Sequence, residues 1–193
     1  MASSETDERF WNIPNALSIS RLALAAVAWG LIARSLFTAA LVVFSIAAIT
    51  DALDGFIARL LKQESDIGRQ LDPLVDKILI IGTLVYLLTI PETGVAPWMV
   101  AAVTTRELAI QWVRSLLEGR GIAFGAKASG KLKTVFQCLA IVAVLFVSAI
   151  GVDRYPPARI VRDALLWIAV LQTLYSGIVY AKLAAPRLKE PRR

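Results

Sequence analysis

Four aspartates at helical spacing are the residues of this sequence best suited to chemistry. Asp51 and Asp54 are three residues apart, and Asp72 and Asp76 are four apart, so each pair lies on one face of a helix. The polar stretch Lys62 to Leu71 is expected to join the two helices as an antiparallel hairpin. The two pairs of carboxylates can therefore face each other at one level of the molecule.

The chemistry of such a cluster follows from its ligand types. Four converging carboxylates repel one another and burial disfavours their charged form, so the cluster needs divalent cations or shared protons. Oxygen ligands select hard ions such as Mg²⁺ or Mn²⁺, and the absence of histidine from the chain argues against a zinc or haem site. Because paired magnesium ions usually act on phosphate oxygens, these residues indicate phosphoryl chemistry.

A structural interpretation of the same aspartates is the alternative. Asp72 followed by Pro73 is a good helix N-cap with proline at the first helical position. Asp51 can pair with Arg59, and Asp76 with a neighbouring cation. One such aspartate is often structural, but four with this spacing favour a metal site.

The elements that must position these residues are long and apolar. The chain of 193 residues is 57% hydrophobic and 19% charged, against about 45–50% and about 25% in soluble domains. This excludes a disordered tail, a secreted disulfide scaffold and a small β-domain, and a lone cysteine, Cys138, cannot form an internal disulfide. A spanning helix needs about 20 mostly apolar residues. We therefore expect an all-α integral membrane protein with six transmembrane helices, at 13–33, 36–61, 72–90, 97–117, 131–151 and 160–182.

The distribution of basic residues predicts the orientation of these helices. Four of the 21 Lys and Arg residues, namely Arg34, Arg154, Arg159 and Arg162, are assigned to the side opposite the termini. By the positive-inside rule the termini and the aspartates are then cytoplasmic. The excess of positive charge thus indicates a membrane surface, and no nucleic-acid partner is expected.

The ends of the chain fit the same orientation. Residues 1–12 are predicted to be a short cytoplasmic segment, since they lack the positive charge of a cleaved signal peptide. Residues 13–182 form one six-helix domain, and residues 183–193 form a basic cytoplasmic tail that can bind anionic membrane lipids.

The residues around the aspartates carry a resemblance to a known family. In order they are Asp51-x-x-Asp54-Gly55-x-x-Ala58-Arg59, eight residues, then Gly68-x-x-x-Asp72-x-x-x-Asp76. This pattern resembles the signature of the CDP-alcohol phosphatidyltransferases at every position. The small residues Gly55 and Ala58 leave room beside the carboxylates, and Arg59 can bind phosphate with two parallel hydrogen bonds.

The resemblance implies a fold, a reaction and a set of site residues. Members of the family have six transmembrane helices, form homodimers and displace CMP from a CDP-linked lipid at the cytoplasmic face. On this chain, Asp51, Asp54, Asp72 and Asp76 would hold two Mg²⁺ or Mn²⁺ ions, with Asp76 also the general base. The contacts to the CDP-lipid would come from Asn15, Ser18, Asp51, Gly55, Arg59 and Ser65, with support from Arg21, Ala58, Gly68 and Thr134.

Two further segments resemble one branch of this family, which makes phosphatidylglycerol phosphate from CDP-diacylglycerol and sn-glycerol 3-phosphate. The first is Asn12-Ile-Pro14-Asn15-x-Leu17-Ser18-x-x-Arg21, with serine where threonine is commoner. The second is Arg106-Glu107, then Arg114, then Gly130-Lys131-x-Lys133-Thr134-x-x-Gln137. The resemblance runs from about residue 12 to 145, and the final helix adds nothing specific.

The second segment also makes chemical sense by itself. An acceptor that carries a phosphate needs cations beside the metal site. Arg106 and Arg114 lie two turns apart on one helical face, and Lys131 and Lys133 lie at a helix N-terminus, which favours anions. We expect these four residues to bind the acceptor phosphate, with Glu107 as a neutralising neighbour of Arg106.

Other functions remain open at this point. The same chemistry could use phosphatidylglycerol, giving cardiolipin, or inositol phosphate or serine as acceptor. A divalent-cation transporter is a more remote alternative, but it would need acidic residues on both sides of the membrane midplane. A membrane prenyltransferase would show Asn- and Asp-rich repeats. A near match to a phosphate-binding P-loop at residues 125–132 is rejected, because Leu132 replaces the required Ser or Thr.

Overall fold

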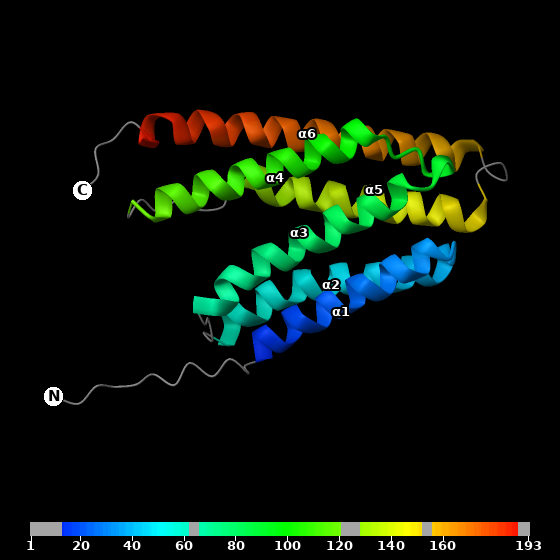
Figure 1. Cartoon of the computed structure of the whole chain (residues 1–193), viewed down its shortest axis with the longest axis horizontal. Coiled ribbons are helices and arrows are strands. Elements are labelled where there is room, and N and C mark those ends of the chain that lie inside the picture. The colour runs from blue at the N-terminus through cyan, green and yellow to red at the C-terminus, as the bar shows by residue number, and fades with distance from the viewer. Residues whose placement is uncertain (1–12, 62–65, 121–127, 152–155, 189–193) are drawn as a thin grey trace.

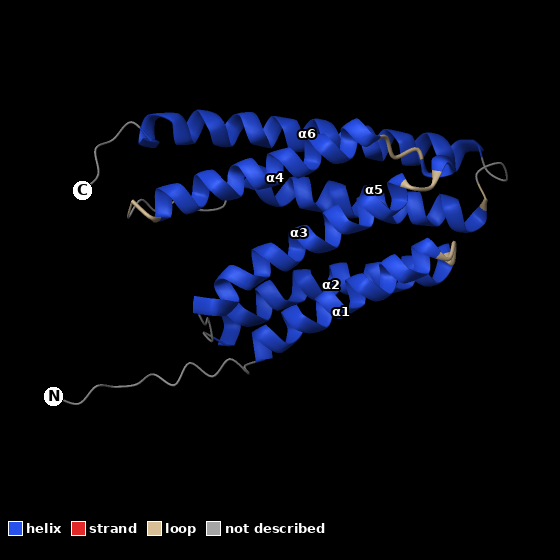
Figure 2. Cartoon of the chain, in the orientation of Figure 1, coloured by secondary structure: helices blue, strands red, loops and turns tan. Residues whose placement is uncertain are grey.

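The protein is a bundle of α-helices. The structure, a computed structural model, describes residues 13–61, 66–120, 128–151 and 156–188, without the side chains at positions 13–18, 51–73 and 128–131. These ranges contain helices and loops but no strand (Figure 2). The elements are α1 (Ile13–Ala33), α2 (Phe37–Leu61), α3 (Asp66–Leu88), the short 3₁₀ helix η1 (Pro91–Thr93), α4 (Pro97–Glu118), α5 (Ala128–Ile150) and α6 (Pro156–Leu188).

The helices run alternately up and down the bundle (Figure 1). One end of the bundle, on the left of Figure 1, contains the start of α1, the end of α2, the start of α3, the end of α4, the start of α5 and the end of α6. We call this the site end. Arg34, at the turn after α1, and Arg159 and Arg162, in the first turns of α6, lie at the opposite end of the bundle. Arg154, which was assigned to the same side, lies outside the described residues.

The packing order differs from the order of the helices in sequence. Helix α1 packs against α2 and α3, α5 packs against α6 and α2, and α6 also packs against α4. Buried alanines such as Ala25, Ala40 and Ala140 lie in the main core, where small side chains let helix backbones approach closely. A second core cluster, Leu117, Tyr180 and Ala184, joins α4 to α6 near the site end.

The outer surface of the bundle is strongly apolar. Large hydrophobic side chains on α4 and α6, including Leu108, Trp112 and Leu171, are more than half exposed, as expected of a surface covered by another apolar phase. Among the described residues, two stretches are long and apolar enough to span a bilayer, Leu132–Ile150 and Pro156–Leu188, with shorter apolar stretches at Ile19–Ala33 and Phe37–Thr50. The number of helices is as predicted, whereas six membrane spans stay a prediction.

Several predicted helix boundaries are wrong. Helix α3 begins at Asp66 rather than residue 72, so most of the polar stretch expected to form the hairpin connection is helical. Asp72 and Pro73 therefore lie inside α3, which rules out Asp72 as its N-cap. Helix α5 begins at Ala128 rather than 131, and α6 covers Pro156–Leu188 rather than 160–182. Local hydropathy underestimates such helices because their ends are polar.

The break at Arg34–Ser35 is confirmed and has a clear local cause. Ser35 adopts a left-handed conformation, with φ of 57°. The backbone N–H of Ser35 donates to the carbonyl of Ile32 at 2.8 Å, and that of Leu36 donates to the carbonyl of Leu31 at 2.9 Å. This is a Schellman motif, which ends α1 and reverses the chain into α2.

Candidate active site

The four aspartates lie on α2 and α3 at matching heights in the bundle. Asp51 is ten residues before the end of α2, and Asp76 is ten residues after the start of α3. At 1.5 Å per residue each lies about 15 Å along its helix from the site end. Asp54 and Asp72 lie closer to that end, also at similar heights. The backbone thus agrees with convergence, although the side chains of Asp51, Asp54 and Asp72 lie outside the described residues.

All six predicted CDP-lipid contacts also fall outside the described side chains. Asn15 and Ser18 belong to the first turns of α1, which starts at the site end. The other positions without described side chains are Gly55, Ala58, Arg59, Ser65, Gly68 and Lys131. Of the supporting residues, Arg21 on α1 is almost wholly buried and Thr134 on α5 is half-buried.

A buried ion cluster joins α4 to α5. Glu107 accepts a hydrogen bond from Nη1 of Arg106 at 3.0 Å and forms an ion pair with Nζ of Lys133 through the same carboxylate oxygen. The three residues are 4%, 9% and 7% exposed, respectively. Two cations around one carboxylate leave one net positive charge in a buried place, where an anion is attracted strongly. The sequence indicated Glu107 only as a neutralising neighbour of Arg106. In the structure it is the centre of the cluster, because it pairs with Lys133 as well.

Helix α3 connects this cluster to the aspartates. Nζ of Lys77 donates a hydrogen bond to Oε1 of Gln111 on α4 at 2.9 Å. Lys77 also interacts electrostatically with Asp76 and Arg114, and Lys133 interacts electrostatically with Asp76. The structure therefore brings a member of the acidic signature together with three of the four cations predicted to bind the acceptor phosphate: Arg106, Arg114 and Lys133. The fourth, Lys131, belongs to the first turn of α5, and its side chain is not described.

Helix α6, which carries no motif of the family resemblance, contacts the buried ion cluster. The guanidinium of Arg106 lies over the ring of Tyr180 at 5.4 Å from the centroid, a distance suited to a cation–π interaction. Helix α6 is also bonded to α5, where Nε2 of Gln137 donates to the buried hydroxyl of Thr173 at 2.9 Å. These contacts join residues far apart in sequence, so neither spacing nor hydropathy could have indicated them.

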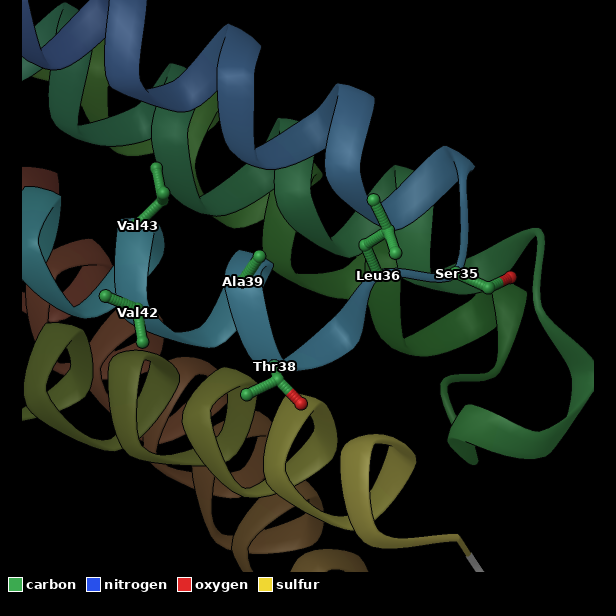
Figure 3. A pocket seen from close by; sticks show the side chains of 6 residues that line it. All are labelled: Ser35, Leu36, Thr38, Ala39, Val42 and Val43. Carbon is green, nitrogen blue, oxygen red and sulfur yellow. The ribbon is translucent and has the colours of Figure 1, made fainter.

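Two hollows differ in their suitability for charged ligands. One, of about 590 Å³, lies at the turn between α1 and α2, away from the site end, and is lined by Ser35, Leu36, Thr38, Ala39, Val42 and Val43 (Figure 3). It offers two hydroxyls and no charged side chain. The other, of about 580 Å³, lies between α4 and α6 and includes Arg106 in its lining. Only the second adjoins the ion cluster.

The fold and the site define an all-helical protein with an apolar exterior, an acidic pair of helices and a buried basic cluster beside it. The family model for CDP-alcohol phosphatidyltransferase matches residues 11–175. The chain belongs to this family and is accordingly a phosphatidyltransferase of a membrane-embedded enzyme class that generally uses divalent metal ions. The match covers much of α6, beyond the limit near residue 145 that the motifs indicated.

Individual relatives extend this comparison. The chain is 34% identical over 187 residues to CDP-diacylglycerol–glycerol-3-phosphate 3-phosphatidyltransferase of Bacillus subtilis, covering 88% of this chain and 93% of that protein. It is 30% identical over 223 aligned positions to the protein of the same name from Cereibacter sphaeroides, covering 93% and 98%. It is 54% identical over 74 residues to the CMP-forming cardiolipin synthase of Homo sapiens, but this covers only 38% of the chain and 25% of that protein.

Proposed function

We propose that the protein transfers the phosphatidyl group of CDP-diacylglycerol to a hydroxyl of sn-glycerol 3-phosphate, giving phosphatidylglycerol phosphate and CMP. The observation that carries the proposal is the buried cluster of Arg106, Lys133 and Glu107 next to Asp76, because it supplies an anion site beside a candidate base. The relatives similar along nearly their whole length carry the name of the enzyme for this reaction.

The aspartates fit a divalent metal. Asp51, Asp54, Asp72 and Asp76 offer only oxygen ligands, and their places on α2 and α3 lie at matching heights. Such a set suits Mg²⁺ or Mn²⁺. Two bound ions would stabilise negative charge on the diphosphate and on the departing CMP.

The residues of the chain would transfer the proton and hold the CDP-lipid. Asp76 accepts the proton of the acceptor hydroxyl, whose oxygen attacks the phosphatidyl phosphorus while the bond from that phosphorus to the CMP oxygen breaks. The CDP-lipid is held at Asn15, Ser18, Asp51, Gly55, Arg59 and Ser65, with Arg21, Ala58 and Gly68 shaping the surroundings.

The acceptor phosphate is held by the basic cluster. Arg106, Arg114, Lys131 and Lys133 provide the charge, and Thr134, next to Lys133 on α5, supports this helix end. An acceptor without a phosphate, such as serine, would leave the net positive charge of the buried Arg106–Glu107–Lys133 cluster without a compensating anion, at an energetic cost.

The membrane arrangement is part of the proposal. The six helices cross the cytoplasmic membrane with the site end and both termini in the cytoplasm, the tail binds anionic lipids, and two copies form a homodimer. The alternation of helix ends along the bundle and the apolar exterior support the multi-pass arrangement.

The decisive experiment measures CMP release. Purified protein is incubated with CDP-diacylglycerol, Mg²⁺ or Mn²⁺, and in turn glycerol 3-phosphate, phosphatidylglycerol, inositol phosphate or serine. We expect CMP release with glycerol 3-phosphate, abolished in Asp76→Asn and retained in Glu118→Gln, an exposed acidic position on the same bundle. No CMP with any acceptor would refute the enzyme assignment, and release with phosphatidylglycerol alone would instead identify cardiolipin synthesis.

The acceptor pocket has its own test. Arg106→Ala should raise the KM for glycerol 3-phosphate about 10- to 100-fold, as expected for the loss of a charge-assisted hydrogen bond, while the KM for CDP-diacylglycerol changes little. Arg159→Ala, at the opposite end of the bundle, is the matched control. Unchanged acceptor kinetics in Arg106→Ala would remove this pocket from the proposal.

A further inference from the structure

A groove between α4 and α6 opens on the side of the bundle. Its volume is about 580 Å³, within the usual range of about 300–1,000 Å³ for ligand sites. The lining is formed almost wholly by apolar side chains, many of them small, including Ala101, Ala109, Gly177, Ile178 and Ala181. Its walls therefore suit a hydrocarbon chain, but the lining also contains one charged side chain.

The charged residue of this lining is Arg106, and Thr105 is the other polar one. The side chain of Arg106 is 92% buried and lines the groove. While Nη1 bonds Glu107, its Nε and Nη2 atoms have no hydrogen-bond partner within the described part of the chain. A Cβ atom at position 177 would lie 3.2 Å from Cγ of Arg106 and 3.9 Å from Nε, so Gly177 leaves the space through which the guanidinium reaches the groove wall.

Two unpartnered donors on a buried guanidinium indicate a missing acceptor. Leaving such donors unbonded costs more than an ordinary hydrogen bond gains, and the cluster has a net positive charge. The missing group is therefore an anion that presents oxygen atoms, and its attached chain must be apolar to fill the rest of the groove.

We propose that this groove binds an anionic phospholipid of the membrane, with one acyl chain along α4 and α6 and the phosphodiester on Nε and Nη2 of Arg106. The lipid is distinct from the CDP-lipid substrate assigned to α1, α2 and α3. A helix of a second copy fits the groove less well, because its backbone carbonyls are already bonded within the helix and offer Arg106 no acceptor.

The lipid and the acceptor phosphate would both bind Arg106, so lipid binding should affect the reaction. This consequence rests on the proposed function. Nε and Nη2 cannot serve a phospholipid and the phosphate of glycerol 3-phosphate together. An anionic phospholipid is therefore a competitive inhibitor towards glycerol 3-phosphate, so that accumulated anionic lipid slows its own synthesis.

The binding test does not depend on activity. Native mass spectrometry of the full chain measures retention of phosphatidylglycerol and of zwitterionic phosphatidylcholine, in wild type, Ala109→Trp and Leu108→Trp. Ala109 lines the groove, whereas its neighbour Leu108 is 60% exposed and does not. We expect the apparent Kd for phosphatidylglycerol to rise about tenfold or more in Ala109→Trp only, with weak phosphatidylcholine retention throughout. Ala181→Phe, at the other wall, gives a second variant should Ala109→Trp fail to fold.

Three results would overturn the proposal. The first is equal retention of the two lipids, and the second is unchanged phosphatidylglycerol affinity in the groove variants. The third is a loss of the dimer in those variants while lipid retention stays intact, because this result would make the groove a contact between copies. In the activity assay, phosphatidylglycerol should raise the apparent KM for glycerol 3-phosphate in wild type and in Leu108→Trp. If CMP release is absent while the lipid still binds through the groove, the proposed function fails and the lipid site stands.

Discussion

The charge of Glu107 should be essential to the stability of the bundle. Its carboxylate contacts Arg106 and Lys133, and the three side chains are at most 9% exposed. Glu107→Gln keeps the size of the side chain but leaves two buried cations without a counter-charge. Removing one partner of a buried ion pair costs about 3–5 kcal/mol in the free energy of unfolding. At about 2–4 °C per kcal/mol for a chain of this size, the unfolding midpoint should fall by roughly 6–20 °C.

The measurement is thermal unfolding of the purified protein in detergent, with and without millimolar inorganic phosphate. Phosphate should stabilise Glu107→Gln more than wild type, because the variant has two buried cations open to an anion. Glu118→Gln, at an exposed position on the same helix, should stay within about 0.5 kcal/mol of wild type. If Glu107→Gln matches wild type in both its unfolding midpoint and its response to phosphate, Glu107 does not neutralise a buried cation and the inferred charge balance of the cluster is wrong.

Three further outcomes are expected. Gly82→Ala should cost about 1–3 kcal/mol of unfolding free energy, measured by denaturation, because the new Cβ would overlap the indole ring of Trp29. Gly30→Ala, with nothing within 4 Å, should be neutral or slightly stabilising, and equal effects of the two substitutions would contradict the packing. Arg162→Met should lower the unfolding midpoint, because Arg162 bonds the carbonyl of Glu92 at 2.8 Å and is 2% exposed, whereas exposed Arg159→Met should not. Chelation with EDTA should abolish CMP release and added Mn²⁺ or Mg²⁺ restore it; activity that survives chelation would exclude the metal assignment.

The sequence predicted the helices better than their ends. Helix α1 has the predicted bounds, and the apolar centres of all six helices coincide with the expected segments. The errors lie where a helix continues through polar residues or proline, as α3 does around Pro73 and α6 at Pro186. Proline weakens a helix locally, but packing against neighbouring helices compensates for it, and a single sequence does not reveal that packing.

The site divides in a similar way. Spacing indicated the aspartates, because they carry formal charge in or beside apolar segments, where charge is costly. The cations of α4 and α5 were indicated by the family resemblance together with the need of a phosphate-bearing acceptor for positive charge. The partners that orient them were missed: Gln111 for Lys77, and Tyr180 and Gly177 for Arg106. Neutral residues cost little in a helix, so their types give no signal until the contacts are seen.

The position of α3 explains how opposed charges can work side by side. Asp76 and Lys77 are adjacent on one helix, and Lys77 is bonded to Gln111 on α4, so α3 forms the seam between the acidic helix pair and the basic cluster. A base that must accept a proton needs nearby negative charge or metal to set its affinity, whereas an acceptor phosphate needs net positive charge. Glu107 reconciles the two demands, because it neutralises one of the two cations that contact it and leaves a charge large enough to hold a phosphate. A cluster without Glu107 would have a stronger attraction for anions but would also repel the divalent cations that we propose the aspartates bind. The buried carboxylate among the cations would therefore allow the proposed metal site and the proposed anion site to lie this close together.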